Sequence, residues 1–440
     1  MKHKLPVLIL SIIITFAGCS SDNESQQAPN FAAELDWVKT FGGSGDDTTQ
    51  DIISTLDGGF AVLGYTNSTD GHITDKTLAV NDYWLLKFDE NGVLEWNKTY
   101  GGSKDDRGQA IIQTQDGGYA ITGYSMSADG DGTVNNGFHD NWVLKLDASG
   151  TILWEKSFGY AGHDHAYDIL QTPDGGYFVS GFLDVTGSGG QGNTGRYSIT
   201  AHGVGEFWAT KLDQTGNIVW QRYFGGTNND RAYSVVQAND GGFVLAGFTE
   251  SDDFDISEAN GSYDFWAIKI DASGTIVWER TYGGSGIERA NAIEKTADNG
   301  YIIVGGTNST DGMISNNYGN SDVWAVKIND AGKLLWERTY GGSDFEDAES
   351  IKATADGGFL ITGNSKSNNN HLVENQGEND IWVLKINASG QLMWQKSIGT
   401  TGLDLGFSAY QTQTGAHVYV CGEFQNNTGG LKDAAIIRLK

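Results

Sequence analysis

The chain has 440 residues, of which 56 are acidic and 28 are basic, so its formal net charge is −28. This charge disfavours nucleic acid, which proteins bind mainly through lysine and arginine contacts to phosphate, and it disfavours unassisted adhesion to anionic membranes. We therefore expect no nucleic-acid partner. Two cysteines allow at most one internal disulfide, so a framework of disulfides cannot be what stabilises the fold.

The N-terminus has the pattern of an export signal. Lys2 and Lys4 precede an apolar run, Leu5–Ala17, that is too short to span a bilayer as a helix. The run ends in Phe-Ala-Gly-Cys19, which resembles the lipobox of bacterial lipoproteins, with Phe where Leu is usual. The resemblance implies cleavage before Cys19 and a lipid on its sulfur. The alternative is a plain secretory signal in which the cysteine is incidental.

On this interpretation residues 1–18 are a lipoprotein signal peptide, and residues 19–34 are a flexible polar tether. Ser20 fits sorting to the outer membrane, and the following Ser-Asp-Asn-Glu is similar to the acidic export tags of Bacteroidetes surface lipoproteins. We expect the protein to be lipid-anchored in the outer membrane and exposed at the cell surface.

A repeat governs the remaining chain, residues 35–440. Seven tryptophans follow one another at spacings of 58, 59 or 66 residues. They are Trp37, Trp96, Trp154, Trp220, Trp278, Trp336 and Trp394. Repeats of this kind mark arrays in which one unit cannot bury its own apolar face.

Each unit contains two hairpin signals. In the second unit, the alternating runs Ala110–Thr114 and Tyr119–Gly123 flank an Asp-Gly pair, which favours a tight β-turn. A second pair of runs, Trp142–Leu146 and Ile152–Phe158, follows a polar loop. Four short strands repeated seven times predict an all-β fold, a seven-bladed β-propeller with four strands per blade.

The two ends of the repeat are complementary. Leu35–Phe41 matches a fourth strand with no first three before it, and the last unit stops after its third strand, Ala434–Leu439. We therefore predict that the N-terminal strand closes the last blade and leaves no open sheet edge. With its edges paired, the propeller is expected to be a monomer.

The third hairpin of each unit carries a family resemblance. The stretch Lys145-Leu-Asp-Ala-Ser-Gly150-Thr-Ile-Leu-Trp154 resembles the tryptophan-docking motif of quinoprotein-type (PQQ-like) propeller repeats. The resemblance implies packing between blades. It implies no quinone cofactor, because the adjacent cysteine pair of quinoprotein dehydrogenases is absent. The whole repeat is similar to tandem repeats of Bacteroidetes and archaeal surface proteins, to which no single activity is attached.

One acidic residue opens the first strand of every unit, and we consider these seven residues a candidate binding ring. They are Asp47, Asp106, Asp164, Asp230, Glu288, Glu346 and Asp404. First strands line the channel of a propeller, so the carboxylates could bind a cation, a basic peptide or a sugar at one mouth. Alternatively, each carboxylate accepts backbone N–H groups of the turn before it.

The third unit departs most from the repeat. Its corner carries Tyr160 and, beside Asp164, His163 and His165, while its glycine-rich loop contains Arg196. The two histidines predict a metal site or an acid–base pair, against the alternative of ordinary surface histidines. In the second unit, Asp129 and Asp131 have calcium-like spacing but lack the bidentate Glu of an EF-hand, which leaves a solvated loop as the alternative.

These observations predict a binding or scaffold module for a glycan or a protein partner. No catalytic residues are assigned, and no cofactor is expected unless calcium binds at Asp129 and Asp131. Two alternatives stay open: an extracellular glycan-active hydrolase or lyase that uses blade-three groups, and a periplasmic scaffold for outer-membrane assembly.

Overall fold

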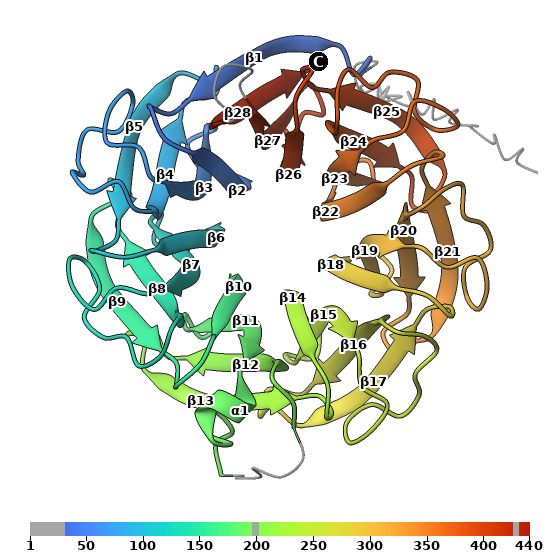
Figure 1. The fold of residues 1–440 in the computed structure, drawn as a ribbon, viewed down its shortest axis with the longest axis horizontal. Coiled ribbons are helices and arrows are strands. Elements are labelled where there is room, and N and C mark those ends of the chain that lie inside the picture. The colour runs from blue at the N-terminus through green and yellow to red at the C-terminus, as the bar shows by residue number, and fades with distance from the viewer. Residues whose placement is uncertain (1–30, 196–201, 426–430) are drawn as a thin grey trace, which may run out of the picture.

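The computed structural model describes residues 31–195, 202–425 and 431–440. Its strands form seven four-stranded antiparallel sheets arranged around a central axis (Figure 1). The predicted all-β, seven-bladed propeller is therefore confirmed. Each blade runs outward from an inner strand a through b and c to an outer strand d. The a strands begin at one end of the central channel, which we call the channel mouth.

The strands are, in blade one, β2 (Asp47–Ser54), β3 (Phe60–Thr66), β4 (Asp82–Phe88) and β5 (Leu94–Tyr100); in blade two, β6 (Asp106–Gln113), β7 (Tyr119–Ser125), β8 (Asp140–Leu146) and β9 (Ile152–Phe158); in blade three, β10 (His165–Gln171), β11 (Tyr177–Leu183), β12 (Glu206–Leu212) and β13 (Ile218–Phe224); in blade four, β14 (Asp230–Gln237), β15 (Phe243–Thr249), β16 (Asp264–Ile270) and β17 (Ile276–Tyr282); in blade five, β18 (Glu288–Lys295), β19 (Tyr301–Thr307), β20 (Asp322–Ile328) and β21 (Leu334–Tyr340); in blade six, β22 (Glu346–Ala353), β23 (Phe359–Ser365), β24 (Asp380–Ile386) and β25 (Leu392–Ile398); and in blade seven, β26 (Asp404–Gln411), β27 (Val418–Gln425), β28 (Lys432–Leu439) and β1 (Leu35–Phe41).

The ring is closed by the first and last strands, as predicted. β1 pairs antiparallel with β28, with Lys39 opposite Ile436, and so supplies the outer strand of blade seven. Arg438 Nε donates to an Asp36 carboxylate oxygen at 2.7 Å and adds a charged link across the seam. Ahead of β1, the Phe31 ring packs 5.2 Å from the Trp394 ring of blade six, so the described chain meets the propeller before Leu35.

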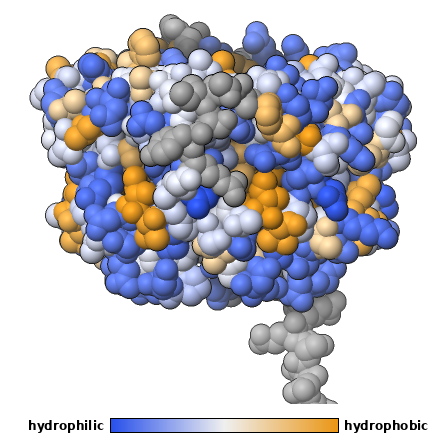
Figure 2. All heavy atoms as spheres, turned by 90° about the horizontal axis from the view of Figure 1, so that it is seen from below, coloured by the Kyte–Doolittle hydropathy of each residue, from blue (hydrophilic) through white to orange (hydrophobic). Residues whose placement is uncertain are grey.

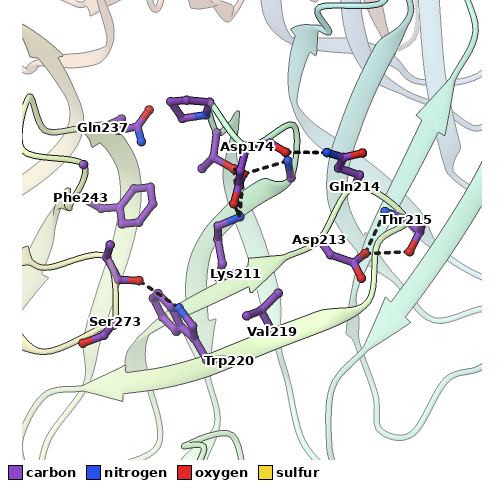
Figure 3. A pocket seen from close by; sticks show the side chains of 15 residues that line it. Asp174, Lys211, Asp213, Gln214, Thr215, Val219, Trp220, Gln237, Phe243 and Ser273 are labelled. Carbon is purple, nitrogen blue, oxygen red and sulfur yellow. Dashed lines mark hydrogen bonds and ion pairs between the residues drawn. The ribbon is translucent and has the colours of Figure 1, made fainter.

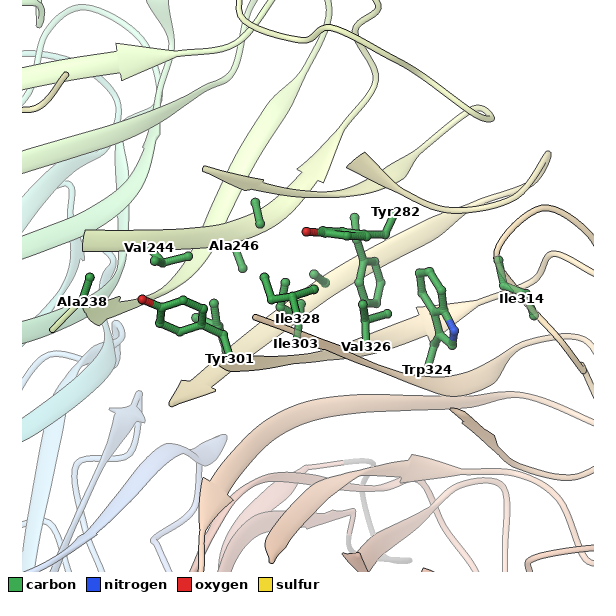
Figure 4. Packing of buried hydrophobic residues seen from close by; sticks show 14 residues of the cluster. Ala238, Val244, Ala246, Tyr282, Tyr301, Ile303, Ile314, Trp324, Val326 and Ile328 are labelled. Atoms are coloured by element: carbon green, nitrogen blue, oxygen red, sulfur yellow. The ribbon is translucent and has the colours of Figure 1, made fainter. Parts of the chain in front are cut away.

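The core lies between blades, because each sheet buries both faces against its neighbours. Every residue of the b and c strands in blades three to six is buried. The c-strand tryptophans are at most 1% exposed; they are Trp84, Trp142, Trp208, Trp266, Trp324 and Trp382. Figure 4 shows this packing between blades four and five, where Tyr282, Tyr301 and Trp324 surround aliphatic side chains. Such large side chains supply most of the apolar burial.

The d-strand tryptophans join successive blades. Gly150, in the c–d turn of blade two, has a φ of 77°, and a methyl group there would lie 2.9 Å from the Trp96 ring of blade one. Tyr100 in the same d strand donates its hydroxyl to the Gly150 carbonyl at 2.6 Å. The outer tryptophan of one blade thus lies against the turn of the next. This is the interblade packing that the docking motif implied.

One element was not predicted. The b–c loop of blade three contains a four-residue helix, α1 (Val185–Ser188), whose first turn is capped by the Asp184 carboxylate. α1 lies at the outer edge of the ring (Figure 1). Within the described ranges no helix is long and apolar enough to cross a membrane.

Candidate functional site

The seven acids at the channel mouth are buried, each with 0% of its surface exposed. Asp106 Oδ2 accepts the Gly102 N–H at 2.9 Å and the Ser127 hydroxyl at 2.8 Å, and so ties the d–a turn to the b–c loop. Each of the other six accepts an N–H from its own d–a turn. This is the turn-stabilising arrangement that was weighed as the alternative. The carboxylates are therefore turned into the protein rather than toward a ligand.

A second set of acids, at the starts of the c strands, faces the first. Asp82 and Asp106 both approach Gly101 so closely that a methyl group there would collide with Asp82. Burial raises the pKa of Asp82 to about 7, and it raises the pKa of the equivalent Asp140 to about 6. One oxygen of each, Oδ1, has no hydrogen-bond partner. Each blade boundary thus holds a buried carboxyl pair that resists full ionisation.

Three histidines meet at the boundary of blades two and three. His139 Nδ1 lies 2.9 Å from His163 Nδ1 and 2.9 Å from His165 Nε2. A parallel backbone bridge joins His139 to His163 and holds these two in register. The structure therefore brings together the two predicted histidines, and it adds His139, which the sequence reasoning missed. The available signal was its position directly before the c-strand acid Asp140.

Aromatic neighbours fix the three rings. His163 stacks on Phe138 with ring centroids 5.1 Å apart, and His165 stacks on Tyr124 at 4.0 Å. Burial, followed by the charges of the neighbouring histidines, lowers the pKa of His165 to about 2. Burial also lowers the pKa of His139. Both rings are therefore neutral at pH 7 and keep a free nitrogen lone pair.

His165 belongs to a wider pattern at the channel mouth. The second position of strand a is Arg107 in blade two, Arg231 in blade four and Arg289 in blade five. Each guanidinium lies over an aromatic ring from the b strand of the preceding blade. The pairs are Arg107 with Tyr65 at 5.0 Å, Arg231 with Phe182 at 4.3 Å and Arg289 with Phe248 at 5.4 Å. We call these three arginines and their rings the arginine rim.

The remaining part of the mouth has the opposite character. The same strand position holds Asp347 in blade six, Leu405 in blade seven and Thr48 in blade one. Burial, followed by the charge of Glu349, raises the pKa of Asp347 well above its usual range. The mouth is therefore polarised, with cations on aromatic rings over blades two to five and acids over blade six.

The channel below the mouth is narrow and acidic. It has a volume of about 300 Å³, and Asp51, Asp168 and Glu294 line it together with Lys352. The Asp51 carboxylate raises the pKa of Lys352, so this ammonium stays charged among the acids. Tyr167 and Tyr233, 4.8 Å apart, join this channel to the arginine rim.

A larger cavity, about 940 Å³, opens at the opposite end of blades three and four (Figure 3). Its walls include Trp220, Phe243 and Lys211, and Lys211 pairs with Asp174 at 3.1 Å. The same lysine–aspartate pair recurs in blades one, two, four, five and six. The charged groups of this cavity therefore belong to the repeat and give no sign of a dedicated ligand.

The remaining predicted residues lie elsewhere. Asp129 accepts the Ser103 N–H at 2.8 Å and Asp131 accepts the Gly101 N–H at 3.1 Å, so both carboxylates brace a d–a turn, and calcium binding there stays a prediction. The Tyr160 hydroxyl lies 3.2 Å from Gln221 Oε1, inside blade three. Cys19 and Arg196 lie outside the described residues.

Comparison with known proteins shows a similar fold only. No family model and no curated protein matches the chain. Among solved structures, the crystal structure of Sqt1 from Chaetomium thermophilum is similar, with 10% sequence identity and a TM-score of 0.44. The similarity covers 88% of this chain and 83% of that chain.

Proposed function

We propose that the protein is a ligand-binding propeller that binds an acidic glycan at the arginine rim, and that a lipid on Cys19 holds it to the outer membrane. One observation carries the binding proposal. In a chain with a net charge of −28, three arginines gather at one side of the channel mouth, each over an aromatic ring. Repeat positions that serve only the fold would not differ in this way between blades.

The chemistry of the rim favours a carboxylated sugar. Guanidinium groups bind carboxylates with two parallel hydrogen bonds, and an aromatic ring offers an apolar face beside them. Arg231 is held in place by its Nε–H, which donates to Asn229 Oδ1 at 3.0 Å. The acids of blade six, opposite the rim, would repel a ligand that is anionic along its whole length, and this fixes the direction in which a chain can lie.

A matched set of oligosaccharides tests this proposal. Isothermal titration calorimetry should detect binding of uronic-acid oligomers and no binding of the corresponding neutral oligomers. Arg231→Gln should weaken binding at least about tenfold, because a hydrogen bond to a charged group contributes roughly 1.5–3 kcal/mol. Arg338→Gln is the control, since Arg338 lies on outer strand β21 and donates to the Glu337 carbonyl. Equal affinity for acidic and neutral oligomers would refute the proposal.

A scaffold for a protein partner is the second candidate, and the outer wall favours it. Figure 2 shows apolar patches on a largely hydrophilic side of the ring. The d strands contribute apolar side chains that are half or more exposed, namely Leu153, Val219, Val277, Leu335 and Met393. Affinity capture with wild-type protein and a Val219→Asp, Val277→Asp double variant separates the candidates. A partner lost from the double variant alone would favour the scaffold.

A further inference from the structure

We infer that His139, His163 and His165 form a transition-metal site with three nitrogen ligands and one open coordination position. The inference does not depend on the proposed glycan binding, because the metal would be bound by residues outside the arginine rim. It rests on the geometry of the three rings, on their hydrogen bonding and on the positions that they occupy in the repeat.

The nitrogen atoms are already near coordinating distance from one another. His139 Nδ1 is 2.9 Å from both His163 Nδ1 and His165 Nε2, and one nitrogen of each ring lies within 4.8 Å of the others. A tetrahedral zinc ion with bonds of about 2.0–2.1 Å holds its ligand nitrogens roughly 3.3 Å apart. Small rotations of the exposed His163 ring would therefore complete the site.

Hydrogen bonding alone does not explain the cluster. A neutral imidazole has one N–H donor and one acceptor lone pair. His139 Nδ1 faces two ring nitrogens at once, and this single atom forms a well-directed hydrogen bond with only one of them. A cation at the centre of the three rings would instead use one lone pair from each. Imidazole nitrogen is a preferred ligand of Zn²⁺, Cu²⁺ and Ni²⁺.

The surroundings orient the rings for this role. His165 Nδ1 lies 3.3 Å from the Tyr167 hydroxyl, and a hydrogen bond donated to that oxygen leaves the lone pair on Nε2, which faces the cluster. Tyr124 and Phe138 stack on His165 and His163 and fix the planes of the two rings. Since His163 is exposed, the fourth position opens to solvent, as in sites where three protein ligands leave room for an exchangeable one.

The fold does not require histidine at these positions. Four other blade boundaries have the same backbone bridge, and the residues that correspond to the three histidines can be read directly from the sequence. These trios are Gly205, Asn229 and Arg231; Tyr263, Ile287 and Arg289; Ser321, Phe345 and Asp347; and Asn379, Leu403 and Leu405. Every trio differs from the others and none contains histidine, so the convergence on three histidines at one boundary calls for a reason other than folding.

The test uses the full propeller, purified with a tag that contains no histidine and stripped of metal by a chelator. Titration with Zn²⁺ should show one equivalent bound per chain, and Co²⁺ in its place should give visible d–d absorption. His163→Ala and His165→Ala should each weaken Zn²⁺ binding at least about 100-fold. His371→Ala is the matched control, because His371 also lies at a blade corner, 3.2 Å from the Gly341 N–H, and outside the cluster.

Two results would overturn the inference. One is wild-type protein that binds no Zn²⁺ and no Co²⁺ at about 100 μM. The other is a His163→Ala variant that binds with wild-type affinity; because this side chain is exposed, the variant should fold, and its circular dichroism and melting temperature without metal would verify that. A melting temperature raised by Zn²⁺ in wild type and in His371→Ala, but not in His163→Ala, would support the site.

Discussion

Replacing Asp322 by asparagine should stabilise the propeller at alkaline pH. Asp322 opens β20, has 0% of its surface exposed and accepts the Tyr318 N–H through Oδ2, while its Oδ1 has no hydrogen-bond partner. Burial, followed by the charge of Glu346, raises the pKa of Asp322 to about 7. The folded protein must therefore ionise a carboxyl group that resists ionisation.

The sign and size follow from proton linkage. The folded state holds the Asp322 proton up to a pH of about 7, whereas the unfolded chain releases it near the ordinary value of 3.8. Stability is therefore lost as the pH rises from about 4 to 7, and the full loss is about 4 kcal/mol at 1.36 kcal/mol per pKa unit. Asp322→Asn avoids this loss, and its amide can donate to Glu346 across Gly341.

Urea unfolding at pH 4 and pH 8 measures the effect. The free energy of unfolding of Asp322→Asn should match wild type at pH 4 and exceed it by up to about 4 kcal/mol at pH 8. Asp311→Asn is the control in the same blade, since the Ser285 N–H lowers the pKa of Asp311 and the replacement should lower stability at pH 8. If Asp322→Asn destabilised the protein equally at both pH values, the buried carboxyl would be a stabilising ion and the reasoning would be wrong.

Three further predictions concern the ring and its anchor. Deleting Leu35–Phe41 should expose the edge of β28 and cause aggregation, whereas an unchanged cooperative melt would contradict closure by β1. Gly150→Ala should lower the free energy of unfolding by more than about 1 kcal/mol, because it adds a contact with Trp96 to the strain of a positive φ; Gly117→Ala, at a φ of 82° with no atom within 4 Å, should show the strain alone. Cys19→Ala should release the protein from membranes in soluble form, and retention of this variant after a salt wash would reveal another anchor.

The architecture could be predicted from the sequence because its signals are local. Asp-Gly turns between alternating runs define each hairpin within about ten residues, and the spacing of the tryptophans counts the blades. Closure was predictable for a related reason: the strand missing after Leu439 is present at Leu35, and a sheet edge without a partner is unfavourable. Helix α1 was not predicted, since four residues contain no helical period.

The site was decided by contacts between blades. In the sequence the acid ring has the pattern of a binding surface, and only the tertiary structure shows Asp106 turned inward to its own turn and loop. His139 is separated by 24 residues from His163, and Tyr65 by 42 residues from Arg107, so no local pattern pairs them. The ring brings the c strand or b strand of one blade beside the a strand of the next. Residue types were therefore set by the sequence, while their partners, their burial and hence their pKa values were set by the way the blades pack.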